Sequence, residues 1–121
     1  MEAIRLYRCF CDVQRLRVLN LLLRGPLCVC HLMKILGEEQ VKMSKQLAYM
    51  KRLGLLEVDR HAQWRIYRLR EPRSPLLVEN LKCLQDVAGE DFKFAEDLRE
   101  RDRILGEEAV SGRPSPCRAT A

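Results

Sequence analysis

Apolar side chains recur every three or four residues over most of this chain, which is the spacing of amphipathic helices. The first such stretch is residues 2–11, where the apolar side chains near one face are Ile4, Tyr7 and Cys11. A second helix follows, with Asp12 as a suitable N-cap and Gly25-Pro26 as its stop. Its apolar positions are Leu16, Leu19, Leu22 and Leu23.

Two further helices are predicted close together in the middle of the chain. The first begins around Cys28 to Cys30 and ends at Gly37. The second runs from about Gln40 to Leu53, stops at Gly54, and carries an apolar stripe formed by Met43, Leu47 and Met50. Two short helices joined by a tight turn, the second rich in small polar and basic residues, favour a helix-turn-helix.

The apolar period changes from helical spacing to two residues directly after Gly54. Leu56 and Val58 alternate with acidic residues, which predicts a half-buried strand. Residues 61–63 are a candidate turn, and residues 64–69 the returning strand. A hairpin in this place is the wing of a winged helix-turn-helix, so the expected fold is mostly α with a small β-hairpin.

The C-terminal part is expected to be helical and then unstructured. Pro72 and Pro75 break the chain, and a helix is marked by Leu77, Leu81, Leu84 and Ala88. A further helical stretch follows Gly89, with apolar positions Phe94, Leu98 and Leu105. We therefore predict one winged-helix DNA-binding and dimerisation domain over residues 1–110 and a disordered tail over 111–121.

Composition and charge indicate the number of domains, the kind of partner and the cellular compartment, but not the function. The 121 residues fit one domain, and the net charge of +5 suits a polyanionic partner. No apolar run approaches the length of a membrane span, and no signal-peptide pattern opens the chain, so a cytoplasmic protein is expected. In that reducing compartment the six cysteines would be free thiols.

The candidate DNA-reading surface is the polar face of the 40–53 helix together with the hairpin. Glutamine, serine and lysine are the side chains that read base edges or contact phosphate in a major groove. The candidates are Gln40, Lys42, Ser44, Lys45 and Gln46 on the helix and Arg60, His61, Gln63 and Arg65 on the hairpin. The alternative is an ordinary solvated helix face.

Cys28 and Cys30 are candidate ligands for a soft ion because they stand at a predicted helix start. The positive end of the helix dipole lowers a thiol pKa there and favours the thiolate. Residues two apart point roughly 200° away from each other around a regular helix. One ion would reach both sulfurs only if this turn is non-helical or unwinds, which suggests a ligand-driven switch. The alternative is two small buried hydrophobes.

The stretch from Gly25 to Leu32, with its Cys-Val-Cys core, resembles the metal box of the ArsR/SmtB family of metalloregulatory repressors. The similarity extends over about Leu6 to Leu69 and includes the family's recognition helix and wing. It implies a homodimeric winged helix that represses a detoxification operon and leaves DNA when metal binds. The Cys-Val-Cys form is similar to the branch that binds arsenite or antimonite through three sulfurs, so Cys28 and Cys30 carry over as ligands.

The chain departs from that branch at the third sulfur. Met33 occupies the position of the third cysteine, and His31 stands where the branch often has Asp. The missing sulfur would come from the partner chain, a small cellular thiol or another cysteine of this chain. The other cysteines are Cys9, Cys11, Cys83 and Cys117. Packing is the favoured role of Cys9, Cys11 and Cys83. Two sulfurs also suffice for a methylated arsenical.

The leading hypothesis is a non-enzymatic repressor of an arsenic-resistance operon, released from DNA by arsenite or antimonite. One alternative is a winged helix that senses oxidation through the same thiols. Another alternative is a zinc- or cadmium-responsive member of the same family. The resemblance implies a zinc site on the C-terminal helices that needs Asp and His pairs. The only histidines of the chain are His31 and His61, so zinc is disfavoured. A thiol enzyme is disfavoured because no Cys-x-x-Cys motif or Gly-rich loop is present.

Overall fold

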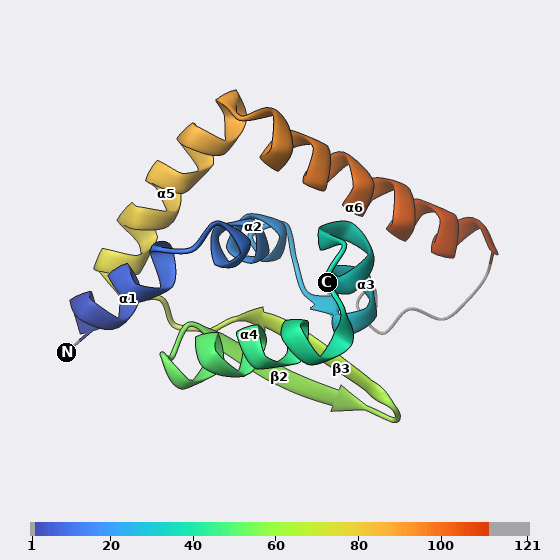
Figure 1. The fold of residues 1–121 in the computed structure, drawn as a ribbon, viewed down its shortest axis with the longest axis horizontal. Coiled ribbons are helices and arrows are strands. Elements are labelled where there is room, and N and C mark those ends of the chain that lie inside the picture. Colours follow the sequence, from blue (N-terminus) through green and yellow to red (C-terminus); the bar gives the residue numbers. More distant parts are fainter. Residues whose placement is uncertain (1, 112–121) are drawn as a thin grey trace.

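The structure, a computed structural model, describes residues 2–111 and confirms the mostly helical winged helix-turn-helix (Figure 1). The helices of this part are α1 (Glu2–Phe10), α2 (Val13–Leu22), α3 (Val29–Leu36), α4 (Gln40–Arg52), α5 (Pro75–Glu90) and α6 (Phe92–Ser111). The strands are β1 (Leu27–Cys28), β2 (Leu56–His61) and β3 (Trp64–Leu69). Of the predicted disordered tail over residues 111–121, Ser111 is instead the last residue of α6, and the rest, including Cys117, lies outside the described residues.

Local signals in the sequence set the start of α2 and the end of α3. The Asp12 carboxylate accepts hydrogen bonds from the backbone N–H groups of Gln14 at 2.8 Å and Arg15 at 3.2 Å, and so caps α2. Gly37 ends α3 with a φ of 64°, a left-handed conformation that costs glycine little. The turn between α3 and α4 is therefore short, and it fixes the angle at which α4 leaves.

The sheet is antiparallel with the order β1-β3-β2, and only its hairpin was predicted. In the hairpin, pairing runs from Leu56 opposite Leu69 to His61 opposite Trp64, so residues 62–63 form the loop. Strand β1 was missed because two residues show no period. Its Cys28 pairs with Ile66 of β3, which attaches the start of α3 to the wing.

Helix α2 lies in the middle of the fold, with α5 and α6 on one side and α4 with the hairpin on the other (Figure 1). Its Leu19 and Leu21 are fully buried. The predicted stripe of α4 is buried as well, since Met43, Leu47 and Met50 are at most 1% exposed. Burial of this stripe leaves the opposite face of α4 on the surface.

Three local predictions were wrong. In α1 the buried residues are Leu6 and Cys9, while the predicted apolar face is exposed, because α1 packs on α2 through its other side. Pro75 does not interrupt α5 but opens it, after Ser74, whose hydroxyl caps the helix. Gly89 lies inside α5, and the break before α6 comes at Asp91.

A buried ion pair fixes α6 against α2. The Arg17 guanidinium donates Nε and Nη2 hydrogen bonds to the Asp97 carboxylate at 2.8 and 2.9 Å. Asp97 is 1% exposed, and its hydrogen bonds raise the pKa of Arg17 above its ordinary value. The pair therefore connects α2, in the middle of the fold, to the C-terminal helix.

We expect Asp97→Ala to destabilise the protein by about 3–5 kcal/mol, because the buried Arg17 charge would lose its partner. Urea denaturation followed by circular dichroism measures this change. Glu79→Ala is the matched control, since Glu79 pairs with Lys82 on the exposed side of α5 and should matter little. A loss as small as that of the control would contradict the assignment.

Candidate metal centre and nucleic-acid interface

Cys28 lies outside α3, and this places the two thiols side by side. It is the last residue of β1 and the N-cap of α3, with an extended backbone at φ −74° and ψ 157°. Cys30 is the second residue of the helix. The two sulfurs and a ring nitrogen of His31 lie within 4.8 Å of one another. The sulfurs therefore meet without unwinding, because the turn is already non-helical at Cys28, which is the first of the two conditions set from the sequence.

His31 fixes the shape of this turn from inside the protein. Its side chain is 1% exposed, and its Nδ1 accepts a hydrogen bond from the backbone N–H of Cys28 at 3.2 Å. Its backbone N–H is in turn directed at the Cys28 side chain, which completes a capping box. Its Nε2 is 2.7 Å from Oε1 of Glu108 on α6. Because Nδ1 accepts, the ring proton is on Nε2, which donates to Glu108.

Cys30 is an unusually acidic thiol. The hydrogen bond with the Cys28 side chain lowers the pKa of Cys30 to about 6, with help from a hydrogen bond to the His31 backbone. Cys30 is therefore largely a thiolate at neutral pH, which is the form that binds soft ions. Cys9 differs from Cys30, because burial raises the pKa of its thiol to about 12. Cys9 is a core residue, as the sequence favoured.

The remaining described cysteines stay away from this centre. Cys11 follows α1 and Cys83 lies on α5, and both are exposed, so the core packing favoured for Cys11 is wrong. Within residues 2–111, the structure brings together Cys28 and Cys30 and adds only His31 to them. The sequence did not favour His31 as a donor, and it gave no sign of Glu108 behind the ring.

A cavity of about 590 Å³ connects the thiols to the predicted DNA-reading residues. Cys28 and Cys30 line it on the α3 side, with Val29 and Met33. The other walls come from α4 and the wing, and consist of Gln40, Ser44, Gln63, Trp64 and Arg65. Trp64 and Cys30 also pack against the buried pair formed by Cys28 and Ile66. Any group bound to the sulfurs thus lies against both elements that would contact DNA.

The predicted reading residues lie on the surface, with one exception. On α4 and the hairpin, the exposed ones are Gln40, Lys42, Lys45, Arg60, His61, Gln63 and Arg65, and Ser44 is half-buried. Gln46 instead turns toward α2. Its side-chain oxygen accepts a hydrogen bond from Arg15 at 3.2 Å, and its amide donates to Asp12 at 3.4 Å. Gln46 therefore joins α4 to the N-terminus of α2.

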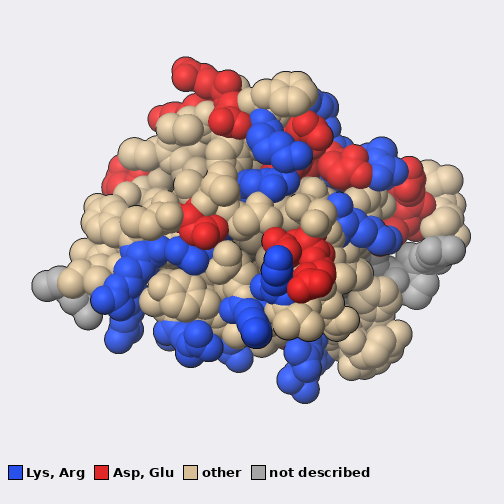
Figure 2. All heavy atoms as spheres, viewed as in Figure 1, with Lys and Arg blue, Asp and Glu red and all other residues tan. Residues whose placement is uncertain are grey.

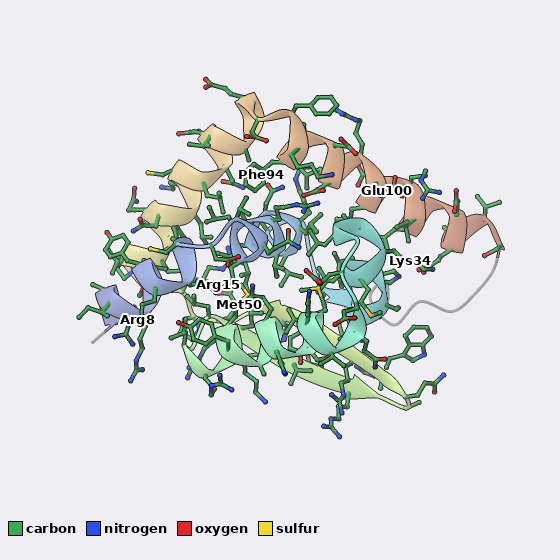
Figure 3. All side chains as sticks on the ribbon, viewed as in Figure 1. Arg8, Arg15, Lys34, Met50, Phe94 and Glu100 are labelled. Carbon is green, nitrogen blue, oxygen red and sulfur yellow. The ribbon has the colours of Figure 1, made fainter. Side chains whose placement is uncertain are left out.

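Basic side chains also extend this surface beyond the predicted set. Lys and Arg, with hardly any Asp or Glu, follow the edge of the molecule below α4 (Figure 2). Lys51 and Arg52 are exposed at the C-terminal end of α4. Arg8 and Arg15, labelled in Figure 3, come from α1 and α2, and Arg15 donates a hydrogen bond to the Arg8 carbonyl at 2.9 Å. Arg15 and Arg52 both stack on the Tyr49 ring, 5.0 and 5.8 Å from its centre. The adjacent Lys51-Arg52 pair was the sequence signal that the prediction passed over.

The fold and this surface define a winged-helix DNA-binding regulator, and comparison with known proteins identifies its family. Residues 12–58 match the family described as "Bacterial regulatory protein, arsR family". The chain is 35% identical over 89 residues to the arsenical resistance operon repressor of Escherichia coli K12, covering 69% of this chain and 75% of that protein. The chain belongs to the arsR family, a family of transcriptional regulators and not of enzymes.

A second relative and one solved structure agree with this assignment, and another solved structure shares the fold. The chain is 39% identical over 74 residues to the arsenic resistance transcriptional regulator ArsR1 of Pseudomonas putida, which covers 60% of this chain and 57% of that protein. The antimony-specific transcriptional repressor AntR is 28% identical, with a TM-score of 0.59 over 74% of this chain and 82% of its own. The homodimeric winged-helix domain of Mb0332 from Mycobacterium bovis shares the fold, with 24% identity and a TM-score of 0.61 over 75% and 82%.

Among residues 2–111, no helix has both the length and the apolar character needed to cross a membrane.

The hydrogen bond between the thiols predicts an unusual pH profile for Cys30. We expect its alkylation by iodoacetamide to reach half its maximal rate near pH 6, the pKa of about 6 given by this geometry. In Cys28→Ala the profile should move to higher pH, because the Cys28 hydrogen bond that lowers the pKa is gone. Peptide mass spectrometry after timed alkylation measures both profiles. A wild-type Cys30 that reacts only above about pH 8 would contradict the arrangement.

Proposed function

We propose that this protein is a homodimeric repressor of an arsenic-resistance operon, and that trivalent arsenic or antimony bound by Cys28 and Cys30 releases it from its operator. The arsenic-resistance regulators among its relatives and the antimony-specific AntR support this function. The homodimeric Mb0332 domain supports the assembly. Apolar side chains left exposed on α1 and α5, namely Ile4, Tyr7 and Val87, are available for a contact between protomers.

The DNA-binding part of the proposal rests on α4 and the wing. A dimer would place its two α4 helices in successive major grooves about 34–36 Å apart, on a two-fold symmetric operator. Gln40, Ser44 and the exposed lysines of α4 would contact base edges and phosphates. Arg60, His61, Gln63 and Arg65 would bring the wing onto the neighbouring backbone or into a minor groove.

The single observation that carries the regulatory part is the shared cavity. Its walls join the thiols to Gln40 and Ser44 of α4 and to Gln63 and Arg65 of the wing. A metalloid held by both sulfurs occupies space beside these side chains, so it favours the arrangement in which they have moved away from it. A ligand shifts an equilibrium only through such a difference in affinity, and a shift from 1:99 to 99:1 needs about 5.5 kcal/mol.

The ligand set favours a trivalent metalloid over zinc. Zinc in proteins takes four ligands in a tetrahedron. The cluster offers two sulfurs and His31, whose Nδ1 already accepts the Cys28 N–H. Ligation by His31 would therefore break the cap of α3. Soft thiolates suit arsenic and antimony, which need fewer donors.

Release by arsenite should require both cysteines. We expect arsenite to dissociate the wild-type protein from a duplex that the ligand-free protein has selected from a random pool, and to leave Cys28→Ser and Cys30→Ser bound. Fluorescence anisotropy of the labelled duplex measures the release. Cys83→Ser is the matched control, because Cys83 is exposed on α5 outside the cluster, and it should respond as the wild type does.

Two outcomes would overturn this assignment. A Cys28→Ser protein that is released by arsenite as readily as the wild type would remove the thiol pair from the mechanism. Release by peroxide alone, with no response to arsenite, would assign the same thiols to an oxidation sensor.

Neutralising one basic side chain of the interface should weaken DNA binding in a salt-dependent way. For Lys45→Ala and for Arg65→Ala we expect a lower affinity and a salt dependence whose slope falls by about 2, because the homodimer loses one phosphate contact in each protomer. Lys93→Ala is the control, since Lys93 is exposed on α6, away from α4 and the wing. Titrations over a range of salt concentrations give the slopes. Equal slopes for all three variants would exclude this face as the interface.

A further inference from the structure

We propose that the preferred inducer is a trivalent arsenical that carries one organic group, with the two oxygen-bonded positions of arsenic taken by Cys28 and Cys30 and the organic group seated in the cavity against Trp64. This inference rests on the proposed function, and it names the class of inducer for the same site. Three features carry it: the number of sulfurs, the occupied ring of His31 and the walls of the cavity.

The number of sulfurs matches two exchangeable positions on the ligand. Arsenite has three such positions, whereas R–As(OH)₂ has two because the arsenic–carbon bond does not exchange. Within residues 2–111 the cluster holds the sulfurs of Cys28 and Cys30, while Cys9 is buried in the main core and belongs to a different group of packed side chains. Met33, in place of a third cysteine, adds an apolar wall to the cavity instead of a thiolate.

His31 does not supply a third bond to arsenic while the turn keeps its shape. Its Nδ1 accepts the Cys28 N–H at 3.2 Å, and its Nε2 is held by Glu108 at 2.7 Å. Both ring nitrogens are therefore engaged, and the ring is almost completely buried. Its role is to position the sulfurs, and the third position on arsenic stays with the organic group.

The bonding step balances without any further reactant. The Cys30 thiolate attacks arsenic and displaces one hydroxide, which takes up a proton and leaves as water. The Cys28 thiol then forms the second arsenic–sulfur bond, and its proton leaves with the second hydroxide as water. Two arsenic–oxygen bonds break and two arsenic–sulfur bonds form, so arsenic stays trivalent and nothing is oxidised.

The cavity offers an apolar place for the group that remains on arsenic. Its volume of about 590 Å³ exceeds what the metalloid alone needs, and Val29, Met33 and Trp64 contribute apolar side chains to its walls. Trp64 is partly buried against Cys28 and Ile66, so its ring adjoins the sulfur site. Trp64 is also the first residue of β3, directly between Gln63 and Arg65. An organic group packed on Trp64 thus displaces the part of the wing expected to contact DNA.

The test compares phenylarsine oxide, which hydrates to the phenyl form of R–As(OH)₂, with arsenite. Trp64 is the only tryptophan of the chain, so its fluorescence reports on binding beside it. We expect phenylarsine oxide to half-saturate the wild-type protein at a concentration about tenfold or more below the arsenite concentration that does so. The reason is that burial of the phenyl ring adds affinity. X-ray absorption of the complex should show two sulfurs and one carbon around arsenic.

Substitutions at Trp64 and at Cys28 separate the contribution of the aromatic side chain from that of the thiols. Trp64→Ala should lose most of the preference for phenylarsine oxide, measured as the ratio of the phenylarsine oxide and arsenite concentrations that release half of the selected duplex. Trp64→Phe should keep the preference, because it retains an aromatic wall. Cys28→Ser should respond to neither compound. Circular dichroism and duplex binding without ligand check that each variant is folded.

The outcomes distinguish this inference from the proposed function. Tighter binding of arsenite, with three sulfurs around arsenic, would overturn the inference and leave the arsenite-responsive repressor standing. An unchanged preference in a folded Trp64→Ala would also overturn it. If neither compound releases DNA from the wild type, both proposals fail.

Discussion

The double role of Cys28 is the constraint on which the rest of this site depends. As the last residue of β1 it pairs with Ile66 of the wing, and as the N-cap of α3 it begins the first helix of the helix-turn-helix. One residue cannot satisfy both elements with a helical backbone, so it is extended. That single conformation turns its sulfur toward Cys30. It also places the thiols at the junction of the wing, α3 and α4.

This junction bears on how a ligand at the two thiols would act on the protein. A pair of sulfurs two residues apart within a helix would need an unwound turn before it could share one ligand. Here the two sulfurs already lie together, and hydrogen bonds from the Cys28 backbone to His31 and from His31 to Glu108 hold the turn that carries them. The ligand therefore does not have to build its site. In the proposed function, its influence on DNA binding comes instead from what it would displace in the cavity shared with Gln40, Ser44 and the wing.

The sequence predicted the parts of this protein that local chemistry decides. The Asp12 cap, the left-handed Gly37 and the buried stripe on α4 follow from neighbouring residues, and so does the pair of strands around residues 62–63. Contacts between distant segments could not be foreseen in this way. The pairing of β1 with β3 involves two residues without a period, and Glu108 lies 77 positions beyond the His31 that it holds. Gln46 has the chemistry of a DNA-reading residue, but the packing of α2 engages it.

Backbone hydrogen exchange, with and without a saturating thiol-specific arsenical, tests this coupling most directly. If ligand capture at Cys28 and Cys30 acts through the junction, exchange should change at the paired positions of β1 and β3 and in the first turn of α4, and stay the same in α5. Saturated thiols with unaltered exchange in the wing and in α4 would contradict the account, because the ligand would then occupy the cavity without reaching the elements that bind DNA.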